Sequence, residues 1–141
     1  YFKCVFDESK KSWFRSFNAI YGKVGRSASL EVVFQLLISK CLPAFTYGLN
    51  ACPINSSDRK SLDFAIFRTV AKILGTFDNT IITDCRNAFG LTNIVEIINK
   101  LKISFLMRYT AAINNICQVF SSFATNELAA LRLQQSLSLA H

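Results

Sequence analysis

The chain has 141 residues, of which 51% are hydrophobic and 18% are charged, and this composition excludes a disordered or collagen-like chain. The formal net charge of +7 favours a folded module that meets an acidic partner, either nucleic acid or anionic lipid. The single histidine is the last residue, His141, which excludes Ser-His-Asp and Cys-His catalysis and any metal site that needs two imidazoles.

The first elements in chain order are a strand and a helix. Residues 1–6 alternate loosely and are β-prone, so we expect a short strand there. Asp7 and Ser9 then offer N-cap oxygens to a helix over roughly Glu8–Val24, which Gly25 ends. Trp13 lies at the centre of the apolar face of this helix, which favours a core role over base stacking.

The next predicted helix begins at Ser27 or Ser29 and stops near Pro43. Pro43 suits the first position of a further short helical segment, Ala44–Ala51. After a turn, Ser57 or Asp58 is the expected N-cap of a long helix. That helix ends at Gly75, and its wide apolar arc indicates packing on more than one side.

Three helical stretches follow. A helix is expected over about Thr80–Phe89, with Asp78 as its N-cap and Gly90 at its end. Thr92 is the expected N-cap of a longer helix that runs through Arg108. Residues Ala111–Leu139 are also expected to be helical, although they contain few signals for where a helix starts or stops. The fold class is therefore all-α, a helical bundle of about five to seven helices with a short β-strand remnant at the N-terminus.

The five cysteines form no C-x-x-C pair, so we expect free and mostly buried thiols in a reducing, intracellular compartment. The two long uncharged stretches contain prolines, amides and hydroxyls, and neither is apolar enough for a bilayer span. The chain starts without Met and stops inside an apolar stretch, so we expect a fragment of a longer protein.

Two kinds of cationic feature suggest phosphate contact. The segment Gly22–Ser27 holds two glycines and two cations before a helix start, although an ordinary helix connection explains it as well. Basic residues also line one face of the first helix and form a second set further on, and either set could track a nucleic-acid backbone or be a solvated face. These residues are Lys10, Lys11 and Arg15, and then Arg59, Lys60, Arg68 and Lys72.

The acidic residues offer no pair with the spacing that joint metal binding requires. Composition and spacing therefore favour a basic helical binding module over a self-sufficient enzyme. No cofactor and no small-molecule substrate is expected for this chain.

An ordered set of short motifs resembles a known family over roughly residues 8–75, and more loosely to about Phe123. The motifs are F-N-A-I-Y-G-K-V-G at 17–25, S-K-C-L-P at 39–43, Y-G-L at 47–49, A-C-P at 51–53, S-L-D at 61–63, Arg68, and K-I-L-G at 72–75. Together they resemble the region just C-terminal to the palm in reverse transcriptases of LINE-type (non-LTR) retrotransposons.

The resemblance implies a helical thumb and its connector, which grip the template-primer duplex behind the active site of an RNA-directed DNA polymerase. It implies three parts: residues 1–6 as the end of the palm sheet, 7–78 as a thumb-like helical region, and 79–141 as a truncated C-terminal connector. The nucleic-acid-binding residues would be Lys10, Lys11, Arg15, Lys23, Arg26, Arg68 and Lys72.

The palm motif of that family, an aromatic residue followed by two adjacent aspartates, is absent from this sequence. No catalysis is therefore expected from this chain alone, and the divalent metal, such as Mg²⁺, would belong to the parent polymerase. The expected partners are an RNA/DNA template-primer duplex and the remainder of that polymerase, in the nucleus or cytoplasm and without a membrane. The alternatives are a helical protein-interaction module and a non-functional relic of a decayed element.

Overall fold

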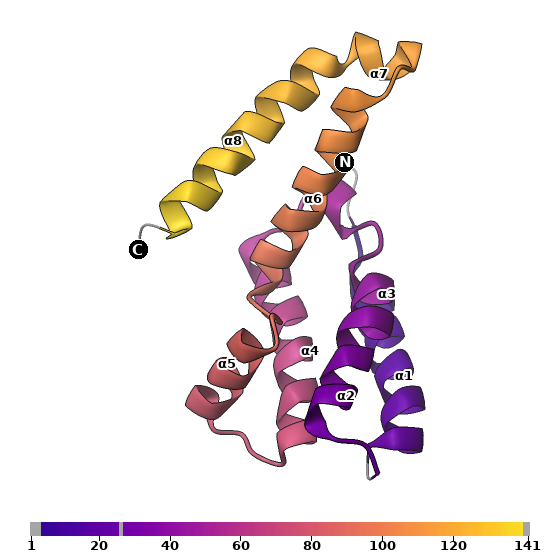
Figure 1. Cartoon of the computed structure of the whole chain (residues 1–141), viewed down its shortest axis with the longest axis vertical. Coiled ribbons are helices and arrows are strands. Elements are labelled where there is room, and N and C mark those ends of the chain that lie inside the picture. The colour runs from indigo at the N-terminus through magenta and orange to yellow at the C-terminus, as the bar shows by residue number, and fades with distance from the viewer. Residues whose placement is uncertain (1–3, 26, 140–141) are drawn as a thin grey trace. The chain divides into compact units, whose positions relative to one another are not determined.

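The computed structural model describes residues 4–25 and 27–139, and all regular secondary structure in these ranges is helical (Figure 1). The expected all-α class is confirmed. Residues 4–6 have no regular structure, so the predicted strand is not found there, and its first part, residues 1–3, lies outside the described residues. The chain forms two compact units, Tyr1–Val95 and Glu96–His141, and the predicted boundary near residue 78 stays a prediction.

The first unit opens with α1 (Asp7–Val24) and a helical run made of α2 (Leu30–Leu36), a π-helical turn (Leu37–Cys41) and α3 (Leu42–Thr46). The prediction that this run stops near Pro43 is wrong. In the π-helical turn the Leu42 N–H donates to the Leu37 carbonyl five residues back, and the wider turn accommodates the ring of Pro43.

The predicted segment Ala44–Ala51 is divided in two. α3 ends at Thr46, and a short 3₁₀ turn covers Leu49–Ala51. Gly48, between them, has a φ of 75°, a left-handed conformation that glycine adopts without strain.

The long helix α4 spans Ser56–Leu74. Its N-cap is Asn55, which has extended backbone angles and whose Oδ1 accepts a hydrogen bond from the Asp58 N–H at 2.8 Å. The prediction of Ser57 or Asp58 as the cap is therefore wrong, because both already lie in the first turn. Gly75 ends α4 with a φ of 68°, as expected.

Two further helices begin within the first unit. α5 (Asn79–Ala88) is capped by Asp78, as expected. α6 (Ile94–Ala111) starts two residues beyond Thr92, so the prediction that Thr92 caps it is wrong, and the buried Thr92 hydroxyl has no hydrogen-bond partner among the described residues. Asn93 Oδ1 instead accepts from the Val95 N–H at 2.9 Å.

The core of the first unit forms around Trp13, which is fully buried. Its Nε1–H donates to Thr69 Oγ1 at 2.8 Å, and the Thr69 hydroxyl donates to the Ala65 carbonyl at 3.0 Å. The ring packs on Phe45 with the centroids 4.9 Å apart. The predicted core role of Trp13 is confirmed, and its one polar atom is satisfied by α4.

The second unit contains most of α6, α7 (Asn115–Val119) and α8 (Ser121–Leu139). Leu106 of α6 is buried with three residues of α8, Ala124, Leu128 and Leu131. Lys102 also pairs with Glu127. Figure 1 shows that α8 runs back along α6 after α7, so the two helices form an antiparallel hairpin.

By length and composition alone, one helical run among the described residues, Leu30–Ala51, could cross a membrane. This is weak evidence, because the core helix of a globular unit passes the same test. Val33, Phe34 and Leu37 of this run are buried within the protein.

The five cysteines are free, as expected, but only Cys41 is fully buried and the other four are half-buried. The expectation of mostly buried thiols is therefore wrong. Burial raises the pKa of the Cys41 thiol to about 11.

Candidate nucleic-acid interface

Helices α1 and α4 lie side by side and run in the same direction. Lys10 Nζ, near the start of α1, donates to Ser61 Oγ of α4 at 3.1 Å. Eight residues further along α1, Asn18 Oδ1 accepts from Lys72 Nζ at 3.2 Å. The seam between these helices therefore brings together cations from two separate segments of the sequence.

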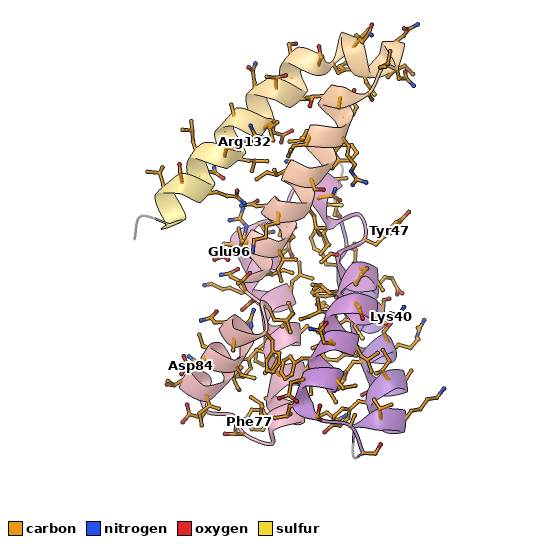
Figure 2. The ribbon with its side chains drawn as sticks, in the orientation of Figure 1. Lys40, Tyr47, Phe77, Asp84, Glu96 and Arg132 are labelled. Atoms are coloured by element: carbon orange, nitrogen blue, oxygen red, sulfur yellow. The ribbon has the colours of Figure 1, made fainter. Side chains whose placement is uncertain are left out.

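A hollow of about 510 Å³ opens along this seam. Three aromatic rings and two of the predicted cations line this hollow. The rings are Phe14, Phe17 and Phe77, and the cations are Arg68 and Lys72. The remaining lining residues are Asn18, Thr69, Ala71 and Gly75. Phe77 is 78% exposed and lies in the loop between α4 and α5 (Figure 2). The hollow thus offers positive charge and flat apolar surface at one place.

The Lys72 ammonium is held by three neighbours. It lies 5.5 Å from the ring centroid of Phe17 and 5.9 Å from that of Tyr21, and these two rings stack with the centroids 5.0 Å apart. The Asn18 side-chain oxygen is its third contact. Cation–π contact and this neutral acceptor fix the position of the charge without cancelling it.

Lys10 and Lys11 each pair with an acidic residue one turn earlier on α1. Lys10 Nζ lies 2.9 Å from Asp7 Oδ1, and Lys11 Nζ lies 2.8 Å from Glu8 Oε1. These hydrogen bonds lower the pKa of both carboxyl groups and raise the pKa of Lys11. The Lys11–Glu8 pair is exposed and contributes little to stability, so a phosphate can displace the Glu8 carboxylate at low cost, whereas Lys10, whose side chain is 29% exposed, also bonds to Ser61.

The other predicted cations differ in their settings. Arg15, Lys23 and Arg68 are exposed, and their side chains make no hydrogen bond or ion pair with any residue in the described ranges. Arg15 is one turn beyond Lys11, whereas Lys23 is in the last turn of α1. Arg26 lies outside the described residues.

The second predicted cationic set does not act as one group, because the structure divides it between two sides of α4. Arg68 and Lys72 line the hollow beside α1. Arg59 and Lys60 line a different hollow, which is bordered by the starts of α5 and α6. Arg59 and Arg68 are nine residues apart, which is about two and a half helical turns, so their side chains project from opposite sides of α4. Which neighbouring helices each side chain meets depends on the packing around α4.

In the described part of the glycine-containing connection after α1, the amides near Ser27 are already bonded within the chain. The N–H groups of Ser27 and Ala28 both donate to the Val24 carbonyl, at 3.1 and 2.8 Å. Gly25 is needed here for close approach, since a Cβ at this position would lie 2.5 Å from the Tyr21 ring. The interpretation as an ordinary helix connection therefore accounts for the segment.

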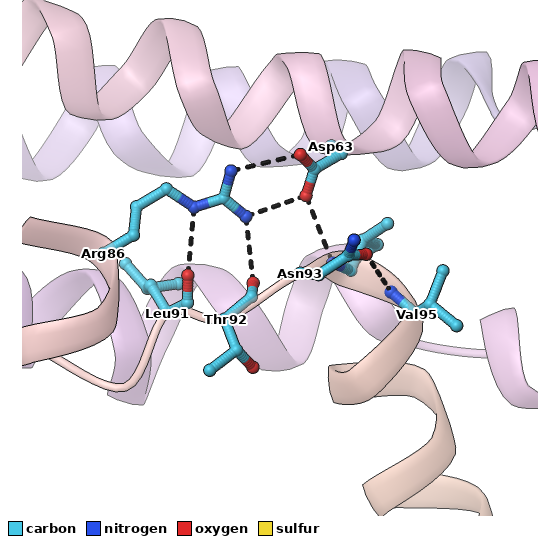
Figure 3. Close-up of polar contacts among 7 residues, drawn as sticks. Asp63, Arg86, Leu91, Thr92, Asn93 and Val95 are labelled. Atoms are coloured by element: carbon cyan, nitrogen blue, oxygen red, sulfur yellow. Dashed lines mark hydrogen bonds and ion pairs between the residues drawn. The ribbon is translucent and has the colours of Figure 1, made fainter. Parts of the chain in front are cut away.

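An ion pair that was not predicted from the sequence connects α4 to α5 and to the segment between α5 and α6 (Figure 3). Arg86 Nη2 donates to Asp63 Oδ1 at 2.7 Å and Arg86 Nη1 donates to Asp63 Oδ2 at 3.1 Å, in a bidentate arrangement. The same guanidinium donates to the carbonyls of Leu91 and Thr92, and Asp63 Oδ1 also accepts from the Ile94 N–H. No local signal marks this pair, because its members are 23 residues apart on different helices.

Among the described residues, no group of three or more His, Cys, Asp or Glu side chains could hold a metal ion. Comparison with protein families, curated proteins and solved structures finds no family model, relative or structural neighbour that matches this chain. The case for a function therefore rests on the residues themselves.

Proposed function

We propose that this chain is the thumb region of the RNA-directed DNA polymerase of a LINE-type mobile element, and that it grips the template-primer duplex without sequence preference. The observation that carries the proposal is the α1–α4 seam, where Arg68 and Lys72 of α4 line one hollow together with Phe14, Phe17 and Asn18 of α1. The motif resemblance over residues 8–75 supports the same region and the same partner.

The mechanism is electrostatic. Each lysine or arginine that contacts a phosphate releases condensed counterions from the nucleic acid, and this release is independent of base sequence. Lys72 is preorganised for such a contact by Phe17 and Asn18, and unpaired Arg15 and Arg68 can turn toward the backbone. The rings of Phe14 and Phe77 provide flat surface beside the charges.

The proposal assigns no catalytic step to this chain. Polymerisation and its divalent metal would belong to the palm of a parent polymerase in the nucleus or cytoplasm, and the remainder of that protein is the second proposed partner. Exposed apolar side chains of the second unit, including Ile113, Val119 and Phe123, support a protein-contacting surface there.

The test is a fluorescence-anisotropy titration of the full chain with a short labelled RNA·DNA hybrid, repeated across salt concentrations. The triple variant Arg15→Ala, Arg68→Ala, Lys72→Ala should weaken binding and make the slope of log affinity against log salt shallower by about 2–3. The matched control is Lys100→Ala, Arg108→Ala, Arg132→Ala, which removes the same charge from exposed positions of the second unit (Arg132 in Figure 2).

Three outcomes would contradict the proposal. Equal loss in both triple variants would mean that net charge, rather than the α1–α4 seam, drives the association. A wild-type chain that is folded by circular dichroism but has no salt-dependent affinity for the hybrid would favour a protein-interaction module. A chain that aggregates and unfolds without cooperativity would favour a relic of a decayed element.

A further inference from the structure

A second hollow, of about 550 Å³, lies on the other side of α4 and is bordered by the first residues of α5 and α6. Its volume is within the range of ordinary small-ligand sites. The residues that line it are Ser56, Arg59, Lys60, Asp63, Phe64, Phe67, Asn79, Asn93 and Val95. The duplex proposal uses none of these residues.

Phe64 is the most unusual of these residues, because a large aromatic side chain is 56% exposed in the middle of a long helix. Its ring is nearly parallel to that of Phe67, with an interplanar angle of 10° and centroids 6.1 Å apart. This offset pair orients a flat apolar surface at the hollow, of the kind on which nucleic-acid bases stack.

The charge in this hollow is positive. Arg59 and Lys60 are exposed and their side chains bond to no described residue, so both cations are available to an anion. The only carboxylate in the lining, Asp63, is neutralised by the bidentate Arg86 (Figure 3). An anionic ligand in this hollow would therefore meet the two unpaired cations of Arg59 and Lys60 and no unpaired carboxylate of the lining.

Hydrogen-bonding groups for a planar polar ligand come from two asparagines. Asn93 uses its Oδ1 for the Val95 N–H, so its two Nδ2 donors remain open to the hollow. The amide of Asn79 bonds to no described residue. Primary amides can bond to the edges of bases, and unpaired bases expose those edges.

We propose that this hollow binds unpaired nucleotides of a single-stranded nucleic acid. Phe64 stacks on a base, Arg59 and Lys60 contact the flanking phosphates, and Asn79 and Asn93 bond to the base edge. An acidic peptide would use the same cations, but the exposed Phe64 ring, parallel to the half-buried Phe67 ring and beside two open amides, favours a base over a carboxylate side chain. The site goes beyond duplex gripping and is separated from it by α4.

The test measures binding of the full chain to two fluorescent single strands of equal length, a thymidine oligonucleotide of roughly ten nucleotides and an abasic strand with the same phosphates. The wild-type chain should bind the oligonucleotide about five- to a hundredfold more tightly than the abasic strand. Phe64→Leu should remove that preference, and Phe64→Tyr, which retains the ring, should preserve it.

The matched control is Tyr47→Leu, which removes an exposed aromatic ring elsewhere in the first unit (Figure 2) and should leave the preference unchanged. Arg59→Gln with Lys60→Gln should make the salt slope shallower by about 1.4 for both strands. Phe64 is an exposed residue, so its variants should remain folded, which circular dichroism verifies.

Three results would overturn the proposal: equal binding of the two strands by the wild-type chain, an unchanged preference in Phe64→Leu, or tighter binding of an acidic peptide than of the oligonucleotide. None of them bears on the hybrid titration, whose variants lie on the α1–α4 seam. A chain that fails the single-strand test can still grip a duplex, and the reverse also holds.

Discussion

Replacing Arg86 with Leu should destabilise the first unit more than any exposed substitution, because Arg86 joins α4, α5 and the start of α6 (Figure 3). Its side chain is only 10% exposed, and it donates two hydrogen bonds to Asp63 and two to backbone carbonyls. Breaking a buried ion pair from one side costs about 3–5 kcal/mol. The Asp63 side chain is 31% exposed, so water would partly solvate its carboxylate once Arg86 is removed. We therefore expect a loss of about 3 kcal/mol in the free energy of unfolding, at the low end of that range.

Urea unfolding of the full chain, followed by circular dichroism, measures this loss. A matched double-mutant cycle with Asp63→Asn, which can still accept from the Ile94 N–H, isolates the ion pair from the carbonyl contacts. We expect a coupling free energy of about 1.5 kcal/mol or more. A destabilisation below about 0.5 kcal/mol, the level of a typical surface substitution, or fully additive losses would refute the reasoning.

Four further results are expected. Thr69→Val should cost about 1–3 kcal/mol in urea unfolding by leaving the Trp13 N–H without an acceptor, whereas Thr69→Ser should cost less; equal losses would contradict this. The fluorescence maximum of buried Trp13 should not shift when nucleic acid is added, and a shift would mean that the core rearranges. Gly75→Ala should destabilise by about 1–2 kcal/mol because its φ is 68°, whereas Gly22→Ala, with open space around it, should not. Because the folded-state pKa of Cys41 is raised from 9.0 to about 11, its neutral thiol favours the folded state below pH 9, and this contribution should be lost as the pH rises toward 11. Cys41→Ala should show a correspondingly smaller loss of stability between pH 9 and 11 in urea unfolding, and identical pH profiles would contradict the assignment.

The sequence by itself determined the all-α class and many helix limits. The N-cap signal at Asp78 and the helix-end signals at Gly75 and Gly90 act within one helical turn, so the sequence alone is enough to recognise them. Where local signals competed, the prediction failed. Asn55 caps α4 in place of Ser57 or Asp58, and the helix continues past Pro43 because a π-helical turn precedes it.

The tertiary structure alone decided which faces meet. Trp13 finds its acceptor 56 residues away, Lys10 reaches Ser61 across 51 residues, and Arg86 finds Asp63 across 23. Local periodicity identifies a basic or apolar face but not the helix that will cover it, because that choice depends on packing between distant segments. Arg59 and Lys60 were therefore separated from Arg68 and Lys72 by the helices that pack on either side of α4.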